Sequence, residues 1–142
     1  MDLRGRGGRH INECWAAGPS SYLGLSTHGF PNLFMILGPN GPFTNLPPSI
    51  ESQVEWISET IRHAESSGVA TVESSREAED GWTKTCEEIA NMTLFPKVES
   101  WIFGANIPGK KKTVMFYMAG IGAYRQQLEA VRNDGYKGFV FS

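Results

Sequence analysis

The chain has few of the residues that metal-binding and disulfide-bonded proteins depend on. Its 142 residues include only two cysteines, Cys14 and Cys86, and three histidines. None of them forms a Cys-x-x-Cys or His-x-x-x-His spacing. Structural metal sites need such clustered ligands, so we expect no metal site. Two distant cysteines are typical of reduced thiols in the cytoplasm, which is the location that we expect.

Charge of one sign and long apolar runs are also missing. The net charge is −2, which gives no general attraction to nucleic acid or to an anionic membrane, so we expect neither partner. No apolar run approaches the roughly 20 residues that span a bilayer. Residues 1–9 are rich in glycine and arginine and lack the apolar centre of a signal peptide. A hydrophobic fraction of 40% is enough to form a core.

Common catalytic motifs are absent as well. The sequence contains no Gly-x-Ser-x-Gly and no Walker loop. Residues 4–8 are glycine-rich but lack the Gly-x-Gly-x-x-Gly spacing, and no predicted strand precedes them, which excludes a dinucleotide fingerprint there. Glu87 and Glu88 are neighbours on a predicted helix and point in different directions. This arrangement favours a solvated helix face over an acid–base pair.

Amphipathic segments predict three helices. The first spans about residues 48–66, where Ile50, Val54, Ile57 and Ile61 form one apolar face of the kind that packs on a core. A capping box that starts at Ser74 predicts the second helix, which ends near residue 93. The third lies within residues 120–134. Its predicted inward side chains are Tyr124, Leu128 and Val131.

Apolar runs at residues 33–37, 69–72 and 113–118 predict strands, the first buried on both faces. The strand–loop–helix units at 33–66 and 113–134 indicate an α/β fold. So few separated strands do not make a complete sheet. We therefore expect an incomplete sheet with helices, and further strands in another part of a larger protein.

Two connections have the composition of binding loops. Residues 38–49 read Gly-Pro-Asn-Gly-Pro-Phe-Thr-Asn-Leu-Pro-Pro-Ser, and they join a predicted strand to a predicted helix. Glycine lets a ligand approach the backbone, and free N–H groups at a helix start attract electron-rich atoms. Residues 100–111 combine Trp101 with Lys110 and Lys111, which suit a sugar or base and a phosphate. An ordinary turn and a surface loop with a buried tryptophan explain the same patterns.

Read in full, both segments closely resemble the C-terminal part of Baeyer–Villiger monooxygenases of the cyclohexanone monooxygenase type. The resemblance continues through residues 1–8, 18–24, 30–34, 53–57 and 134–139, so it covers essentially the whole chain. Members of this family are longer single-chain flavoproteins with two dinucleotide-binding domains. They bind FAD and NADPH and insert one oxygen atom of O2 beside a ketone carbonyl, which gives an ester or a lactone.

The resemblance implies that residues 1–142 are the C-terminal part of the FAD-binding domain, including the family's control loop at about residues 96–112. The family's FAD fingerprint, nicotinamide-binding domain and catalytic arginine with its aspartate partner have no counterpart here. We therefore expect no catalytic residue in this chain, an N-terminal portion of the enzyme as its partner, and no activity of the chain alone.

The resemblance also assigns roles to individual residues. FAD would contact Asn40, Thr44, Asn45 and Leu46, largely through the backbone. The ketone pocket would be lined by Phe43, Leu46 and Phe116, which are apolar as a cyclic ketone site requires. NADP would contact Trp101 through its ribose, with Lys110 as a second contact. Residues 95–99 and 118–122 depart from the family pattern in ways that affect the loop hinge and local backbone freedom.

An alternative function belongs to another class. The chain could be a non-catalytic binding domain, or one that pairs with itself, and reuse the fold without the chemistry. Apolar surface left uncovered by absent strands would drive such self-association.

Overall fold

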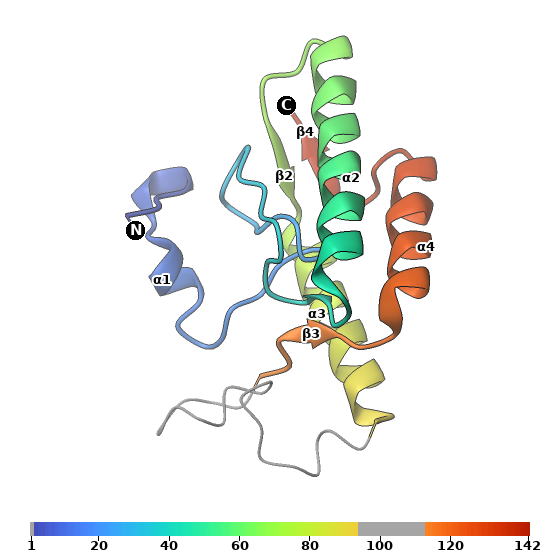
Figure 1. Ribbon diagram of the computed structural model, residues 1–142. Helices are drawn as coiled ribbons and strands as arrows, with labels where there is room; N and C mark the ends of the chain where they lie inside the picture. Colours follow the sequence, from blue (N-terminus) through green and yellow to red (C-terminus); the bar gives the residue numbers. More distant parts are fainter. Residues whose placement is uncertain (1, 94–112) are drawn as a thin grey trace.

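Helices α2 (Leu46–Ser66), α3 (Arg76–Asn91) and α4 (Gly120–Asn133) dominate the fold, which comes from a computed structural model that describes residues 2–93 and 113–142. In Figure 1, α2 and α4 stand side by side and α3 lies below and behind them. The 3-10 turn η1 (Arg6–Gly8) and the short helix α1 (Ile11–Cys14) lie at the opposite side of the molecule from α4.

The strands form two small sheets within the described residues. β1 (Gly41–Pro42) pairs in parallel with β3 (Phe116–Tyr117), with Gly41 opposite Phe116. β2 (Val72–Ser74) pairs antiparallel with β4 (Phe139–Phe141), with Val72 opposite Phe141. Each sheet has two strands, which is too few for independent stability. The predicted α/β class with an incomplete sheet is confirmed.

The three predicted helices are present with small shifts at their ends. α2 begins at Leu46, two residues before the predicted start, and takes Pro47 and Pro48 into its first turn, where a missing N–H costs little. The cap of α3 is Ser75, whose side chain accepts the N–H of Ala78 at 3.2 Å. The prediction of Ser74 as the cap is wrong, because Ser74 is buried as the last residue of β2.

The predicted strand at residues 33–37 is wrong, the one at 69–72 is displaced to β2, and the one at 113–118 is shortened to β3. Ile36 and Leu37 are 43% and 41% exposed, and Leu37 has a φ of 57°, which no strand accommodates. The N–H of Met35 donates to the carbonyl of Leu25, and that of Leu37 donates to Oε1 of Gln53. The segment is apolar, but in this chain it has no neighbouring strand to pair with.

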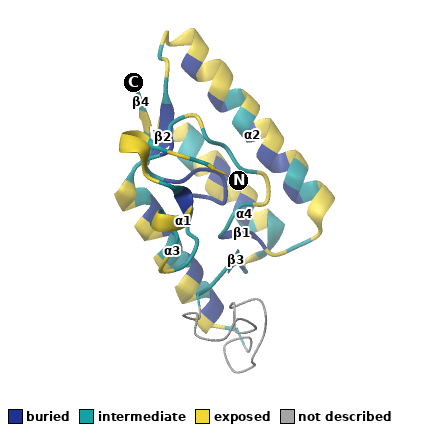
Figure 2. Ribbon diagram, turned by 90° about the vertical axis from the view of Figure 1, so that its left-hand side faces the viewer, coloured by how far each residue is buried: buried dark blue, intermediate teal, exposed yellow. Residues whose placement is uncertain are grey.

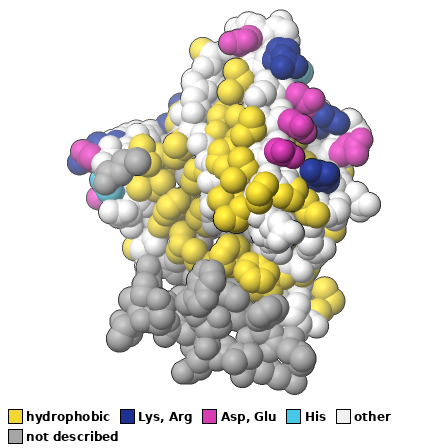
Figure 3. Space-filling view, in the orientation of Figure 1, with side chains coloured by type: hydrophobic (Ala, Val, Ile, Leu, Met, Phe, Trp, Pro, Cys, Tyr) yellow, Lys and Arg dark blue, Asp and Glu magenta, His cyan; other side chains and the backbone are white. Residues whose placement is uncertain are grey.

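The apolar face predicted for α2 exists, but only part of it packs on the core: Ile57 contacts the core cluster, whereas much of the rest is exposed. Val54 and Ile61 are 46% and 43% exposed, whereas Gln53, Trp56 and Thr60 on the other side are buried. Figure 2 shows the alternation of buried and exposed positions along α2, and Figure 3 shows a band of hydrophobic side chains that follows this helix. We call this face the apolar stripe. It consists of Leu46, Ile50, Val54, Ile57 and Ile61.

Aromatic rings and a polar chain of hydrogen bonds fill the core. Trp82 stacks on Tyr117 with ring centroids 4.8 Å apart. The hydroxyl of Tyr124 donates to the carbonyl of Leu23 at 2.6 Å and lies 3.1 Å from Nε2 of Gln53, which donates to it. Tyr124 and Leu128 of α4 are buried, as the sequence predicts. Across residues 2–93 and 113–142, no helix has both the length and the apolar character that a bilayer span needs.

Candidate functional site

The 38–46 loop passes so close to a neighbouring backbone segment that glycine is required on both. A Cβ at Gly24 would lie 2.5 Å from the Cα of Gly41, and one at Gly38 would lie 2.6 Å from the carbonyl oxygen of Gly24. Gly24 also has a φ of 73°. The hydroxyl of Ser21 donates to the carbonyl of Pro39. These glycines therefore allow the backbone at Gly24 to pack closely against the 38–46 loop, and this packing holds the loop in place.

Asn40 is fully buried at the centre of this loop and has a φ of 60°. Its backbone N–H donates to the carbonyl of Met115 at 2.7 Å, and its Nδ2 donates to the carbonyl of Val114 at 2.8 Å. Its own carbonyl accepts Nε1–H of Trp82 at 3.1 Å. Its Oδ1 is buried without a partner. The contact of Asn40 with FAD stays a prediction, and its hydrogen bonds here are to this chain.

Two of the residues expected in the ketone pocket lie side by side. The rings of Phe43 and Phe116 have centroids 5.2 Å apart and an interplanar angle of 57°. The N–H of Phe43 donates to the carbonyl of Tyr117 at 2.9 Å, which extends the pairing of β1 with β3. Phe43 is 39% exposed, and Leu46, three residues further on, is 56% exposed. Phe43 and Phe116 thus form an aromatic pair that is partly exposed, and Leu46 adds an exposed apolar side chain close to Phe43 in sequence.

The start of α2 offers less hydrogen-bonding capacity than the sequence suggests. Asn45 precedes the helix without a side-chain capping bond, and its carbonyl accepts the hydroxyl of Ser49 at 2.9 Å. The first four N–H groups of a helix have no partner within it. Two of these positions are Pro47 and Pro48, which have no N–H, so only two donors remain, one of them the N–H of Leu46. Thr44 is half-buried beside it.

Trp101 and Lys110, the predicted NADP contacts, lie outside the described residues, as does the predicted control loop at about 96–112. Their roles stay predictions that rest on the resemblance.

Burial keeps the titratable groups behind the loop neutral. Sγ of Cys86 lies 4.0 Å from the carbonyl of Asn40, and burial, with a smaller contribution from Glu87, raises the pKa of this thiol to about 12. Burial also raises the pKa of Tyr117. A thiol with so high a pKa is protonated at neutral pH and is a poor nucleophile. In the part of the chain that the structure describes, no three His, Cys, Asp or Glu side chains gather closely enough to hold a metal ion.

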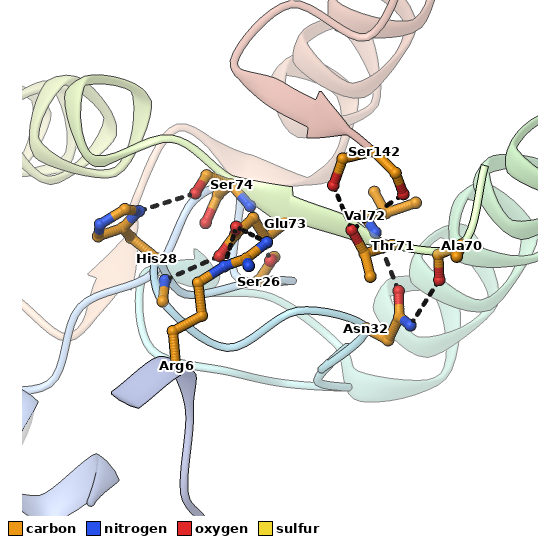
Figure 4. A network of polar contacts seen from close by, with 11 residues as sticks. Arg6, Ser26, His28, Asn32, Ala70, Thr71, Val72, Glu73, Ser74 and Ser142 are labelled. Carbon is orange, nitrogen blue, oxygen red and sulfur yellow. Dashed lines mark hydrogen bonds and ion pairs between the residues drawn. The ribbon is translucent and has the colours of Figure 1, made fainter. Parts of the chain in front are cut away.

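A second polar cluster, which the sequence does not predict, joins residues 6–32 to β2 (Figure 4). The buried carboxylate of Glu73 accepts Nε–H of Arg6 at 2.7 Å and the N–H of Gly29 at 3.2 Å. Nδ1 of His28 lies 3.2 Å from the carbonyl of Ser74, which can only accept, so this nitrogen carries the hydrogen. The side chains of Arg6, Glu73 and His28 all make their hydrogen bonds within this chain, which indicates a structural role for the cluster.

Glu79 of α3 is a second buried carboxylate that holds the same region. It accepts the hydroxyl of Ser20, the hydroxyl of Thr27 at 3.1 Å and the N–H of His28 at 2.6 Å. These partners are more than 50 residues away in sequence, so no local pattern in the sequence identifies them. Three donors satisfy the carboxylate, which explains why an acidic side chain is tolerated there.

The chain is similar to known proteins over nearly its whole length. It is 64% identical over 140 residues to a Baeyer–Villiger monooxygenase of Pseudooceanicola batsensis, and 57% identical over 139 residues to a cyclohexanone 1,2-monooxygenase of Acinetobacter sp.. These matches cover 99% and 98% of the chain and 26% of each relative. A phenazine N-monooxygenase of Lysobacter antibioticus is 56% identical over 99% of the chain and is matched over 26% of its own length. No protein-family model matches the chain.

Solved structures agree with the sequence comparison. A closed crystal structure of cyclohexanone monooxygenase is similar over 100% of this chain with a TM-score of 0.97 and 61% identity. The NADP+-bound cyclohexanone monooxygenase of Rhodococcus sp. Phi1 gives a TM-score of 0.96 and 57% identity, again over 100% of this chain. In both cases, 27% of the solved chain is matched. The chain therefore spans about a quarter of the length of the relatives it matches.

Proposed function

We propose that this chain, which belongs to the Baeyer–Villiger monooxygenase family of the cyclohexanone monooxygenase type, is the C-terminal part of a flavin-dependent ketone oxygenase. The complete enzyme would use NADPH and O2 to insert one oxygen atom beside a ketone carbonyl and release an ester or a lactone. The similarity of the whole chain to such enzymes, at up to 64% identity, carries the proposal.

The described residues suit one wall of the proposed site. FAD, when bound, supplies the chemistry that activates O2. The N–H of Leu46 and the exposed start of α2 are available to it, while Asn40 is held inside the loop. Phe43, Phe116 and Leu46 would bury the ring of a cyclic ketone and exclude water from it. The role of this chain is thus to bind and orient the ketone beside the flavin.

NADPH is the second proposed cofactor. Support for it comes from the family resemblance of Trp101 and Lys110 and from the NADP+-bound relative of known structure. We propose that residues 96–112 belong to the control loop that contacts the nicotinamide cofactor.

The proposed partner is the N-terminal portion of the same enzyme, which would supply the other walls of the site and its catalytic arginine. The apolar stripe on α2 supports this proposal, because Leu46, Val54 and Ile61 are all more than 40% exposed in this chain. Exposed apolar surface of this extent is typical of an interface. We also propose a cytoplasmic location, in keeping with free Cys14 and Cys86.

The decisive experiment compares the full-length protein with the isolated 142-residue chain. Each is supplied with FAD, NADPH, O2 and cyclohexanone, and the lactone is measured by gas chromatography. We expect lactone, with one oxygen atom from labelled O2, only from the full-length protein. Lactone made by the isolated chain would show that the catalytic groups lie within it, and no product from either would refute the proposed reaction.

A non-catalytic binding or self-associating domain is the second candidate. The exposed apolar stripe supports it as well, since two copies could cover each other's stripes. Micromolar binding of FAD by the isolated chain would favour a binding domain.

The oxygenation assay can also be run with a phenazine as the substrate. This would separate a ketone oxygenase from an N-oxygenating enzyme, because the Lysobacter antibioticus relative is named a phenazine N-monooxygenase.

A further inference from the structure

Asn40 makes an unusual number of connections for one residue in a loop, one through its side chain and the others through its backbone. It contributes two hydrogen bonds to consecutive carbonyls, those of Val114 and Met115, in the segment that leads into β3. Its φ of 60° lies in the left-handed region, which asparagine and glycine tolerate best. Because Asn40 is fully buried, loss of its side chain would leave the carbonyl of Val114 without this donor.

The third connection of Asn40 reaches α3. Nε1–H of Trp82 donates to the Asn40 carbonyl at 3.1 Å, and the ring of the same tryptophan stacks on Tyr117 of β3 with an interplanar angle of 15°. Trp82 therefore contacts both the loop that carries Asn40 and the strand to which Asn40 is bonded. The three segments form one buried junction.

Few other hydrogen bonds join β1 to β3. The two strands pair over two residues each, and the bond from the N–H of Phe43 to the carbonyl of Tyr117 extends the pairing by one. A ladder this short is marginal without support. Because Phe43 follows β1 directly and Phe116 is the first residue of β3, any shift between the strands changes the separation of the two rings, now 5.2 Å.

We propose that Asn40 is a positioning residue that fixes Phe43 against Phe116 and thereby sets which ketones the site accepts. The proposal rests on the proposed function, because that function makes these rings the wall of a ketone pocket. Asn40 acts through the two aromatic residues, and its own hydrogen bonds stay within the chain.

The test is the substitution Asn40→Gly in the full-length holoenzyme. Glycine adopts a positive φ without strain, so the variant removes the Nδ2 donor and the side-chain volume but keeps the backbone bond to Met115. A misplaced wall should lower kcat/KM for cyclohexanone roughly 10- to 100-fold, mainly through KM, with a smaller loss for larger ketones. The amide hydrogen of Phe43 should exchange faster, because its bond to Tyr117 depends on the same strand pairing.

Asn32 offers a matched control. It also has a positive φ, of 59°, and its side chain donates to the carbonyl of Ala70 and accepts the N–H of Val72, at 3.0 and 2.9 Å. These contacts lie beside β2, in the region of Figure 4. We expect Asn32→Gly to lower thermal stability and to leave ketone selectivity and exchange at Phe43 unchanged.

Trp82→Phe is a second variant for the case in which Asn40→Gly does not fold. It removes the Nε1–H donor but leaves an aromatic ring against Tyr117, so we expect a smaller change of selectivity in the same direction. Unchanged selectivity together with unchanged exchange at Phe43 in the folded variant would overturn the proposal. The same changes in Asn32→Gly would overturn it too. Failure of the wild-type enzyme to oxidise any ketone refutes the proposed function instead, and the exchange rates then still decide whether Asn40 positions β1 against β3.

Discussion

At the scale of single residues, burial determines the protonation of groups around the core. It raises the pKa of the Cys86 thiol and of the Tyr22 hydroxyl to about 12, from ordinary values of 9.0 and 10.0. In the unfolded chain both groups lose their protons at the lower pH. Each therefore contributes stability that is complete below its ordinary pKa and is lost as the pH rises toward about 12.

This difference predicts alkaline destabilisation of the chain. We expect Tm to fall progressively above about pH 9, with Cys86 contributing first and Tyr22 from about pH 10. Circular-dichroism melts at constant ionic strength would measure it. Cys86→Ala should start from a lower Tm, because it leaves a cavity, and should lose the earliest part of the decline. A Tm that is constant up to about pH 11 would contradict the assignment of these pKa shifts.

At the scale of elements, α2 has two faces with different functions. The face toward α4 carries Trp56, which is 3% exposed and whose Nε1–H donates to the carbonyl of Leu128 at 3.0 Å. The opposite face carries the apolar stripe, which includes Val54. The helix is thus fixed to α4 by polar and aromatic groups, while its exposed aliphatic side chains, Leu46, Val54 and Ile61, are available to another surface.

The two faces predict opposite responses to substitution. In urea unfolding of the 142-residue chain, Trp56→Ala should cost about 3–5 kcal/mol. Val54→Ser should change the free energy of unfolding by no more than about 0.5 kcal/mol. In the full-length protein we expect Val54→Ser to cost more than about 1 kcal/mol, because the N-terminal portion would cover this side chain. Equal effects in both proteins would argue that the stripe stays exposed.

At the scale of the whole molecule, the apolar stripe lies on the same helix as the proposed ketone wall, since Leu46 belongs to both. A partner that covers the stripe would therefore also complete the site. The fold holds itself together through the aromatic core and through the buried carboxylates Glu73 and Glu79, and it leaves this side of the molecule open.

Association is the property to measure at this scale. Light scattering should find that the isolated chain self-associates, and that a separately expressed N-terminal portion converts it into a one-to-one complex. Val54→Lys combined with Ile61→Lys should weaken both associations by placing charges on the stripe. Glu55→Lys, an exposed change on the same helix, is the control and should weaken neither. If the chain is monomeric and does not bind the N-terminal portion, the proposal that this portion is its partner is contradicted.

The sequence by itself determined the helices, the α/β class and the family. Helical spacing is a local property, and Tyr124 and Leu128 are inward as their spacing indicates. The motifs at residues 38–49 and 100–111 were long enough to identify the family, which the comparisons confirm. Phe43 and Phe116 were both identified by resemblance, although 73 residues separate them, and the fold brings their rings together.

Only the tertiary structure decided what each face and loop contacts. The apolar run at 33–37 is no strand, because strand formation needs a partner that local sequence cannot supply. Val54 and Ile61 of α2 point outward, because the hydrogen bonds of Gln53 and Trp56 orient another face of the helix toward α4. The carboxylates of Glu73 and Glu79 find their donors far along the chain, as does Asn40 at Val114. Such contacts depend on separation in space, and separation in sequence does not specify it.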